Sequence, residues 1–593
     1  MNNKVVNVKE KVREFSADKI KLNINGSLLS VADIMKMANG KTILIDAIDN
    51  VITELNGGYQ FSKEIAEDWV NRLLLLTKVG QEVMADPYAM LKDTARYAPP
   101  QFFTQDKLEE YKNNSDVIVL DTMPNVALKD PSPAENKIMK HTLRIIPAGG
   151  VDSTFYKGLN KEEKAQLMEM LYDKELVDVF GKYDAKDYII RSFASINDKT
   201  EKKNVSIIES LIVNSYKNGI RNIALYGNGM SYQPIKEYLD KKFGHIKDLN
   251  IVVIPQPLLP KMKKVDNEVI ISAANGGYPG GHGHGLKSCL AHEEIQSLIK
   301  ENDLTNFYFS NADNIPADSW GAGHIAKVIN NLDDKDMAFF FVWELLRKGG
   351  FGGEIQDKLL NVLYNQVIEV ELAGKCGVDL SKFADSKGGY NTNVAAGNLE
   401  KTGETFKDMP MALKQKGNEY MFEASLGTAA TTKQDHKTGE PSLQKNTKSV
   451  LGPKEAAFQH WMHIAIRARG DLLFALMSNL VKVVKIDTEY GPLYTLTMNR
   501  KGDMPFPILK GEIADKANTF EFVRAFINAH VDVSEFTGTI EINGNPKDVT
   551  FTGNIKFIGG IDSKITFNFN RTGGVNGGIF DMTEKKNAEY TFN

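Results

Sequence analysis

Two imidazoles lie among small, turn-forming residues in the stretch from Tyr278 to Gly285, which reads Tyr-Pro-Gly-Gly-His-Gly-His-Gly. Glycine allows positive φ and lets a ligand approach the backbone closely, so such a stretch can present N–H donors to a flat or anionic group. It lacks the Lys-Ser/Thr ending of a P-loop and the acidic partner of a dinucleotide fold. We expect a binding loop. Two ligands stay open: a zinc ion on His282 and His284, or a sugar or nucleotide.

A polar segment follows the aromatic run Phe307–Phe309, which itself predicts a strand. In open α/β sheets, ligands bind outside the carboxyl ends of the strands. A carboxylate at such an end, here Asp313, can hold a ribose, a sugar hydroxyl or a magnesium ion. The alternative is an Asx-turn in which Asn311 and Asp313 only cap the loop.

The order and spacing of these two segments resemble the UTP:glucose-1-phosphate uridylyltransferases, or UDP-glucose pyrophosphorylases. Segments within residues 470–480 and 507–540 are similar to the carboxyl-terminal third of that family, and the resemblance extends over roughly residues 140–570. It implies an α/β fold with a nucleotidyltransferase-like, mainly parallel (Rossmann-like) sheet flanked by helices, and a β-helix-like carboxyl-terminal domain. The implied reaction joins UTP and a sugar-1-phosphate, first of all glucose-1-phosphate, into a UDP-sugar and pyrophosphate. A UDP-N-acetylhexosamine pyrophosphorylase is an alternative.

The resemblance also implies which residues bind the nucleotide. They are two glycines of the family's first glycine loop, a glutamine whose amide reads the uracil edge, a glycine of the histidine stretch and a carboxylate: Gly149, Gly150, Gln256, Gly281 and Asp313. The implied catalytic residues are Lys157, Arg467 and Asp313. The two cations neutralise phosphate oxygens, and Asp313 is the ligand of Mg²⁺, the implied cofactor. Lys157 could equally be a solvated surface lysine, and Arg469 competes with Arg467.

The sugar side of the site is implied by the same resemblance. Its residues are His282, Gly283, Asn311, Glu369, Asn391 and Asn393. Carboxylate and amide groups at strand ends can bridge neighbouring sugar hydroxyls, which an apolar pocket would leave unpaired. Without the resemblance, Glu369, Asn391 and Asn393 would be interpreted as loop residues.

The chain departs from the family pattern at two positions. Asp152 stands in the first glycine loop where a glycine is expected, and a carboxylate there repels a triphosphate unless magnesium or a lysine intervenes. His284 stands where relatives carry an acidic or other polar residue. These departures leave a second hypothesis open, a catalytically weakened protein that binds sugar nucleotides without turnover.

Composition describes an ordinary globular chain. The 593 residues are 42% hydrophobic and 25% charged, with a net charge of −4, which gives no general attraction to nucleic acid or acidic membranes. Two cysteines argue against a disulfide-built secreted domain. The first residues lack an apolar signal core, and no run approaches the length of a membrane span. We therefore expect a cytoplasmic enzyme without nucleic-acid or membrane partners.

Patterning along the chain predicts three units: a helical extension over residues 1–135, a catalytic α/β domain over 136–484 and a β-rich domain over 485–593. The extension is expected to lack strands and to contain a helix at Ala66–Leu76 capped by Ser62. Alternating signals in the α/β domain predict strands at Leu143–Ile146, Ile223–Tyr226 and Asn250–Ile254 and helices at Lys161–Tyr172 and Val205–Lys217. Either terminal unit could mediate a homo-oligomer.

Overall fold

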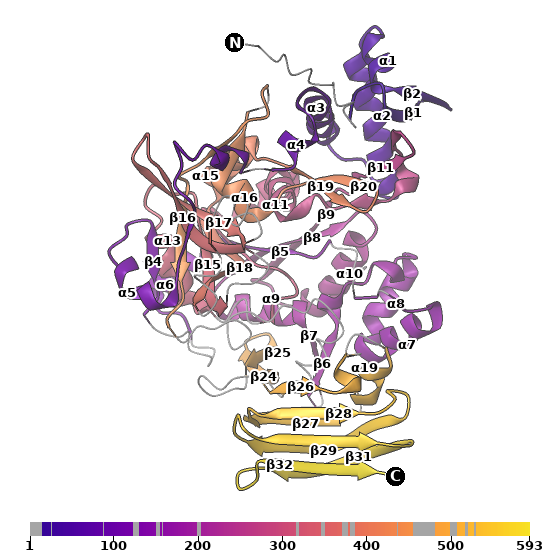
Figure 1. The fold of residues 1–593 in the computed structure, drawn as a ribbon, viewed down its shortest axis with the longest axis vertical. Coiled ribbons are helices and arrows are strands. Elements are labelled where there is room, and N and C mark those ends of the chain that lie inside the picture. Colours follow the sequence, from indigo (N-terminus) through magenta and orange to yellow (C-terminus); the bar gives the residue numbers. More distant parts are fainter. Residues whose placement is uncertain are drawn as a thin grey trace, which may run out of the picture.

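The computed structural model describes residues 15–24, 26–86, 88–121, 130–149, 155–156, 158–198, 203–315, 320–345, 350–370, 378–379, 386–435, 437–454, 481–498, 507–515, 520–526 and 529–593. Figure 1 shows an α/β body between two other parts: the amino-terminal helices lie at one end, and a stack of strands near the carboxyl terminus lies at the other.

A mixed sheet of eleven strands forms the centre of the body. Its main path runs through β4 (Val117–Val119), β23 (Thr447–Leu451), β15 (Met337–Leu345), β18 (Lys387–Asn398), β14 (Asn306–Phe309), β5 (Thr142–Pro147), β8 (Asn222–Asn228) and β9 (Asn250–Gln256). Neighbours on this path pair in parallel, except that β18 is antiparallel to both β14 and β15. The branch strands are β3 (Gln101–Phe102), β16 (Gly350–Asp357) and β17 (Val362–Glu369). The predicted mainly parallel sheet is confirmed.

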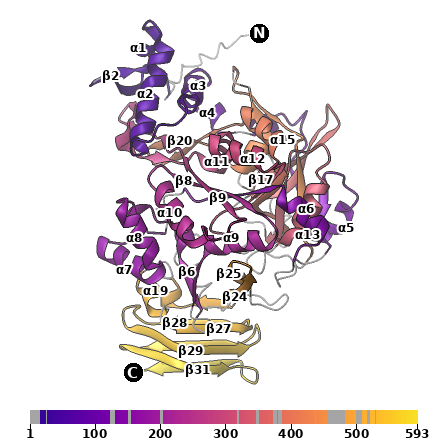
Figure 2. The same ribbon diagram turned by 180° about the vertical axis from the view of Figure 1, so that it is seen from behind.

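Helices cover both faces of this sheet, which is why β8 is buried along its whole length. One face packs against α9 (Ile207–Lys217), α10 (Tyr232–Phe243) and α13 (Gly321–Asn330), as Figure 2 shows for α9 and α10. The other packs against α11 (Gly281–Ala291), α12 (Glu293–Glu301) and α16 (Leu426–Thr431). Successive residues of β5 divide between the two cores: Ile145 belongs to the second and Ile146 to the first.

The predicted helices and strands of this part are found with small shifts. The helix predicted from Lys161 is α7 (Lys161–Leu171). The helix predicted from Val205 begins at Ile207, because Ser206 caps it: the Ser206 hydroxyl accepts from the Glu209 N–H, and Glu209 accepts from the Ser206 N–H. Val205 belongs to β7 (Lys203–Ser206).

The expectation that the amino-terminal extension lacks strands is wrong. β1 (Ile20–Ile24) pairs in parallel with β12 (Glu268–Ile271) and antiparallel with β2 (Ser27–Ser30), in a six-stranded sheet with β11 (Met262–Val265), β19 (Ala412–Lys416) and β20 (Glu419–Glu423). The sequence does carry a hairpin signal between β1 and β2, the Asn-Gly dipeptide at residues 25–26, whereas the pairing of β1 with the distant β12 leaves no local pattern. The predicted helix is confirmed within α3 (Lys63–Val79), which follows α2 (Gly40–Leu55), and the Ser62 hydroxyl caps it.

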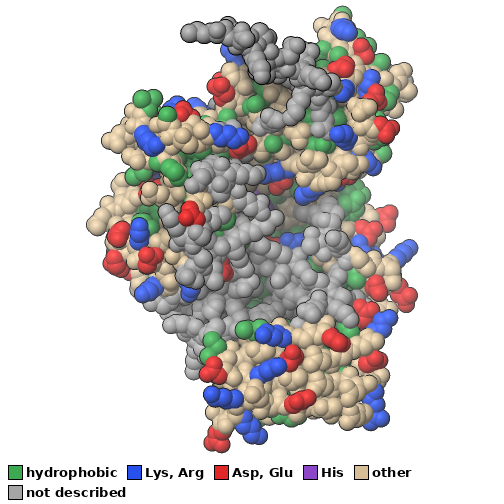
Figure 3. Space-filling view, in the orientation of Figure 1, with side chains coloured by type: hydrophobic (Ala, Val, Ile, Leu, Met, Phe, Trp, Pro, Cys, Tyr) green, Lys and Arg blue, Asp and Glu red, His purple; other side chains and the backbone are tan. Residues whose placement is uncertain are grey.

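The carboxyl-terminal residues form two facing parallel sheets, the predicted β-helix-like arrangement. One contains β26 (Ile508–Lys510), β28 (Thr539–Asn543), β30 (Lys564–Phe569) and β32 (Asn587–Phe592), and the other β27 (Ala529–Phe536), β29 (Val549–Gly559) and β31 (Gly573–Asp581). Aromatic rings stack between rungs: the ring centroids of Phe569 and Phe592 are 4.6 Å apart. Figure 3 shows acidic and basic side chains interspersed over this stack. The domain boundaries at 135 and 484 stay predictions.

Candidate functional site

The carboxyl ends of four parallel strands meet at one edge of the central sheet. Phe309 at the end of β14 pairs with Ile145 of β5, and Asn228 at the end of β8 pairs with Gln256 at the end of β9. Segments leaving these strands carry predicted nucleotide and sugar residues: Gly149, Gln256, Asn311 and Asp313. The strand order thus gathers residues that are far apart in sequence at the carboxyl ends of the strands, the place where open α/β sheets bind ligands.

Gln256 is wedged between two glycines at this edge. Gln256 is only 4% exposed, and its Nε2 donates a hydrogen bond to the carbonyl of Pro279 at 2.7 Å. A Cβ on Gly149 would lie 2.9 Å from Gln256 Oε1, and one on Gly285 would lie 2.8 Å from Gln256 Nε2. The amide is therefore fixed in orientation by the first glycine loop and by the histidine stretch.

The histidine stretch is the first turn of a helix rather than the expected loop. Helix α11 begins at Gly281, after Gly280 in the left-handed region with φ 69°. The Gly283 N–H donates to the Ala424 carbonyl at 2.9 Å, and the Ala424 N–H donates to the Gly280 carbonyl at 2.9 Å. A Cβ on Gly281 would lie 2.4 Å from that Ala424 oxygen, so glycine serves close backbone packing here. The site gains a helix amino terminus, which favours anions.

His282 and His284 lie on different sides of this turn, because residues two apart on a helix do not face each other. Among the described residues no group of three or more His, Cys, Asp or Glu side chains is arranged to hold a metal ion. The geometry therefore gives no support to a zinc site shared by the two imidazoles.

His282 faces the end of β14. Its ring meets that of Phe309 edge to face, with centroids 6.1 Å apart. Burial lowers the pKa of His282, although the nearby carboxylates of Asp313 and Glu423 act in the opposite direction. The imidazole is thus mainly neutral near pH 7 and can donate one hydrogen bond and accept another.

His284 points toward helix α3 instead. The residue is 5% exposed, and burial lowers the pKa of its imidazole to about 4, with Asp68 of α3 opposing the shift. Its Nδ1 is buried with no hydrogen-bond partner in the described structure, and a Cβ on Gly280 would lie 2.9 Å from it. The His284 ring therefore packs against Gly280 and fixes the start of α11.

Asp313 makes an ion pair that the sequence did not reveal. Nη2 of Arg191 donates to Asp313 Oδ2 at 2.5 Å, and the side chains are 23% and 13% exposed, respectively. Arg191 opens a short 3-10 helix, η4 (Arg191–Phe193), in the segment between β5 and β8. No motif marks this arginine, since its partner lies 122 residues further along the chain.

A buried arginine of the core fixes the segment before Asp313 by hydrogen bonds. Arg144 of β5 is fully buried and donates to the Ser310 hydroxyl at 2.5 Å and to the Ile145 carbonyl at 2.8 Å. Asn311 Oδ1 is buried and finds no hydrogen-bond partner in the described part of the chain, so Asn311 does not make the Asx-turn that sequence allowed. This amide oxygen is therefore available to accept a hydrogen bond from a ligand or to bind a metal ion.

Asn391 and Asn393 lie on β18, next to the end of β14. The register of β18 against β15 shifts between Phe340 and Phe341, which places Thr392 and Asn393 in a bulge, with Asn393 at φ 54°. Asn391 Nδ2 donates to Asn393 Oδ1 at 3.2 Å, and the Asn393 N–H donates to Asn391 Oδ1 at 3.0 Å. Bulges re-aim side chains, and this one lies next to the pairing of Phe309 with Ala395, at the end of β14 where the Asp313 segment begins.

Several predicted site residues lie outside the described residues: Gly150, Asp152, Lys157, Arg467 and Arg469. Glu369 ends β17, and its side chain also lies outside the description.

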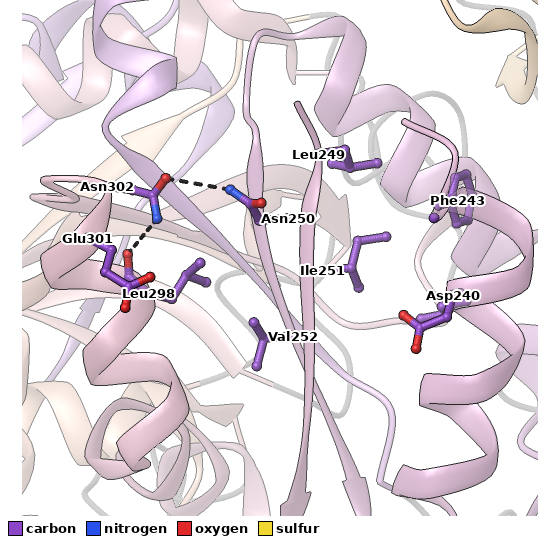
Figure 4. Close-up of a pocket in the computed structure, with 11 residues that line it drawn as sticks. Asp240, Phe243, Leu249, Asn250, Ile251, Val252, Leu298, Glu301 and Asn302 are labelled. Carbon is purple, nitrogen blue, oxygen red and sulfur yellow. Dashed lines mark hydrogen bonds between the residues drawn. The ribbon is translucent and has the colours of Figure 1, made fainter. Parts of the chain in front are cut away.

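A surface hollow of about 530 Å³ lies at the opposite edge of the sheet (Figure 4). It is lined by the start of β9 and the ends of α10 and α12, and Asn250 Nδ2 donates to Asn302 Oδ1 at 3.5 Å across it. Asn250 and Gln256 stand at opposite ends of β9, six residue steps or about 20 Å apart. The hollow is therefore separate from the polar constellation.

The central sheet and the helices on both of its faces define a nucleotidyltransferase-like α/β fold. Two solved structures of UDP-glucose pyrophosphorylase from Leishmania major are similar to it. A histidine-to-leucine mutant is 12% identical, with coverage of 92% of this chain and 99% of its own and a TM-score of 0.55. A leucine-to-aspartate mutant, solved with UDP-glucose, is 14% identical, with coverage of 80% and 91% and a TM-score of 0.51.

No protein-family model and no curated protein sequence matches this chain. The similarity to the two solved structures confirms the resemblance to the UDP-glucose pyrophosphorylases at the level of the fold. Within the described residues, no helix is both long enough and apolar enough to cross a membrane.

Proposed function

We propose that this chain is a divergent uridylyltransferase that forms a UDP-sugar and pyrophosphate from UTP and a sugar-1-phosphate, with glucose-1-phosphate as the first candidate. The observation that carries the proposal is the meeting of Gly149, Gln256, the amino terminus of α11 and Asp313 at one sheet edge. The fold shared with UDP-glucose pyrophosphorylase supports it.

The chemistry asks the protein to align two anions. A phosphate oxygen of the sugar phosphate attacks the α-phosphorus of UTP in line, and pyrophosphate leaves, without a covalent intermediate. The amino terminus of α11 offers a favourable potential to phosphate, and neutral His282 offers a hydrogen bond without adding charge. In this proposal the Gln256 amide reads the uracil edge, and Asn391 and Asn393 supply amides for the sugar.

Magnesium fits the oxygen atoms at the end of β14. The orphaned Asn311 Oδ1 and the Asp313 carboxylate are hard oxygen ligands of the kind Mg²⁺ prefers. When bound, the ion would neutralise phosphate charge. Asp313 is paired with Arg191 in this structure, so holding the ion requires that this pair loosen.

The same pair favours a second candidate function, a sugar-nucleotide binding protein with weak or no turnover. An Asp313 carboxylate engaged by Arg191 is less available to a metal or a ribose. Asp152, a departure in the first glycine loop, acts in the same direction by repelling phosphate.

Pyrophosphate release from UTP with a panel of sugar-1-phosphates tests the enzyme, beside calorimetric titration with UTP and UDP-glucose. Turnover with one sugar-1-phosphate supports the transferase and names its substrate. Binding without turnover selects the second candidate, and binding of neither ligand removes both.

A further inference from the structure

A long connection brings Arg191 to the site. Between β5 and β8 the chain forms α7, α8 (Lys174–Lys182), the 3-10 helix η3 (Lys186–Tyr188) and η4 before α9. Figure 2 shows α7 and α8 beside α10, on the flank of the body. Phe193, two residues after Arg191, is buried against Phe180 of α8 and Tyr238 of α10, with ring centroids 6.1 and 6.0 Å away. The arginine therefore projects from a packed base.

The position of the guanidinium is fixed by its charge partners. It lies 2.5 Å from the Asp313 carboxylate, in the segment that follows β14. Its charge also acts on His282, in the first turn of α11. A cation is thus present where the helix amino terminus and the end of β14 meet, which is where the proposed phosphates would lie.

Carboxylate and phosphate are alternative partners for arginine. The guanidinium has five N–H donors in a planar fork that matches either oxyanion. A diphosphate carries more charge than one carboxylate, so it competes well for the same donors.

We propose that Arg191 is a phosphate-binding residue, held on Asp313 in the ligand-free protein and transferred to the diphosphate when the sugar nucleotide binds. This inference rests on the proposed function and adds a cation that lies outside the family-like motifs. Transfer of Arg191 also frees the Asp313 carboxylate, so that binding of the nucleotide and availability of Asp313 are coupled.

Calorimetric titration of the full chain with UDP-glucose and with uridine, in EDTA to exclude metal, tests the inference. Arg191→Ala should weaken the binding of UDP-glucose about ten- to a hundredfold, which is the effect of losing a hydrogen bond to a charged group. It should leave the affinity for uridine unchanged. Arg191→Lys should recover part of the loss, because a point charge remains. Arg221→Ala is the matched control: Arg221 pairs with Asp248 at 2.9 Å, is 26% exposed and lies at the amino end of β8.

A purely structural role of Arg191 predicts different affinities for these variants. If Arg191 only neutralises Asp313, the double variant Arg191→Ala with Asp313→Asn regains wild-type affinity for UDP-glucose, which overturns the inference. Equal losses for uridine and UDP-glucose, or no loss in Arg191→Ala, also overturn it. If the wild-type chain binds neither compound, the proposed function fails together with the inference, and that outcome is distinct from a wild type that binds while Arg191→Ala binds equally well.

Discussion

Gly285 and Gln256 are in contact across the site: a Cβ on Gly285 would lie 2.8 Å from Gln256 Nε2 and 2.9 Å from the buried hydroxyl of Tyr226. The first turn of α11 therefore closes directly on the ends of β8 and β9. The orientation of the glutamine amide depends on the absence of one methyl group.

Gly285→Ala should displace Gln256 and weaken UTP binding, although alanine is the better helix former. Overpacking of this kind costs about 1–3 kcal/mol, which we expect in the free energy of unfolding measured by denaturant titration, together with a weaker calorimetric affinity for UTP.

Gly403→Ala is the matched control, because Gly403 lies in α15 (Leu399–Thr405) and an added Cβ there meets nothing within 4 Å. It should stabilise the chain by about 0.5–1 kcal/mol and leave UTP binding unchanged. Equal behaviour of the two variants would mean that the contact between Gly285 and Gln256 has no consequence.

Asp313→Asn should lower pyrophosphate release by about a hundredfold or more, the size typical for loss of a group that acts on the transition state. The loss of its ion pair with Arg191 should cost about 1–3 kcal/mol of unfolding free energy, because both side chains are largely shielded from water. Asp248→Asn breaks a similar pair with Arg221 away from the site and should keep full activity. Normal turnover in Asp313→Asn would reduce Asp313 to a partner of Arg191.

Asn56 connects the amino-terminal helices to the segment that follows Gln256. Its Oδ1 accepts from the Leu258 N–H at 3.0 Å, and its Nδ2 donates to the Leu258 carbonyl at 3.1 Å, in a residue 1% exposed. Asn56→Ala leaves two buried backbone groups unpaired, at about 1–3 kcal/mol each. We expect a marked drop in melting temperature and weaker UTP binding.

The control for Asn56 is Asn418→Ala, which removes an exposed bond to the Lys264 carbonyl and should change little. If Asn56→Ala destabilises the chain without affecting UTP binding, the connection serves the fold alone.

The elements that the sequence predicts correctly are those determined by short-range patterns of residues. Buried apolar runs marked β5, β8 and β9, and turn residues after them marked the ligand-binding edge. Contacts between distant segments left no such mark. Arg191 reaches Asp313 through the packing of α7 to η4, and Ile20 pairs with Val269, which lies 249 residues further along the chain. The glycines of the histidine stretch predict a loop because they allow positive φ and close approach of a ligand, whereas in the structure their small size lets the backbone of α11 approach Ala424.

His284 links the site to pH, and its effect has a definite sign. Burial lowers the pKa of the folded imidazole to about 4, below its ordinary value near 6.5, so the unfolded chain binds the proton more tightly. The stabilising effect of a neutral His284 is complete above pH 6.5 and is lost as the pH falls toward 4. A shift of this size corresponds to about 3 kcal/mol.

We therefore expect the free energy of unfolding, measured by urea titration at several pH values, to fall between pH 6.5 and 4 more steeply in the wild type than in His284→Gln. Asp68 is the carboxylate that acts on His284. Burial raises the pKa of Asp68, but Arg72 and Lys287 lower it below its usual range, so the comparison with His284→Gln isolates the imidazole. His245→Gln, at an exposed position, should leave the slope unchanged. If His284→Gln and the wild type have equal slopes, His284 is protonated without cost, and its place beneath Gly280 does not make the first turn of α11 sensitive to acid.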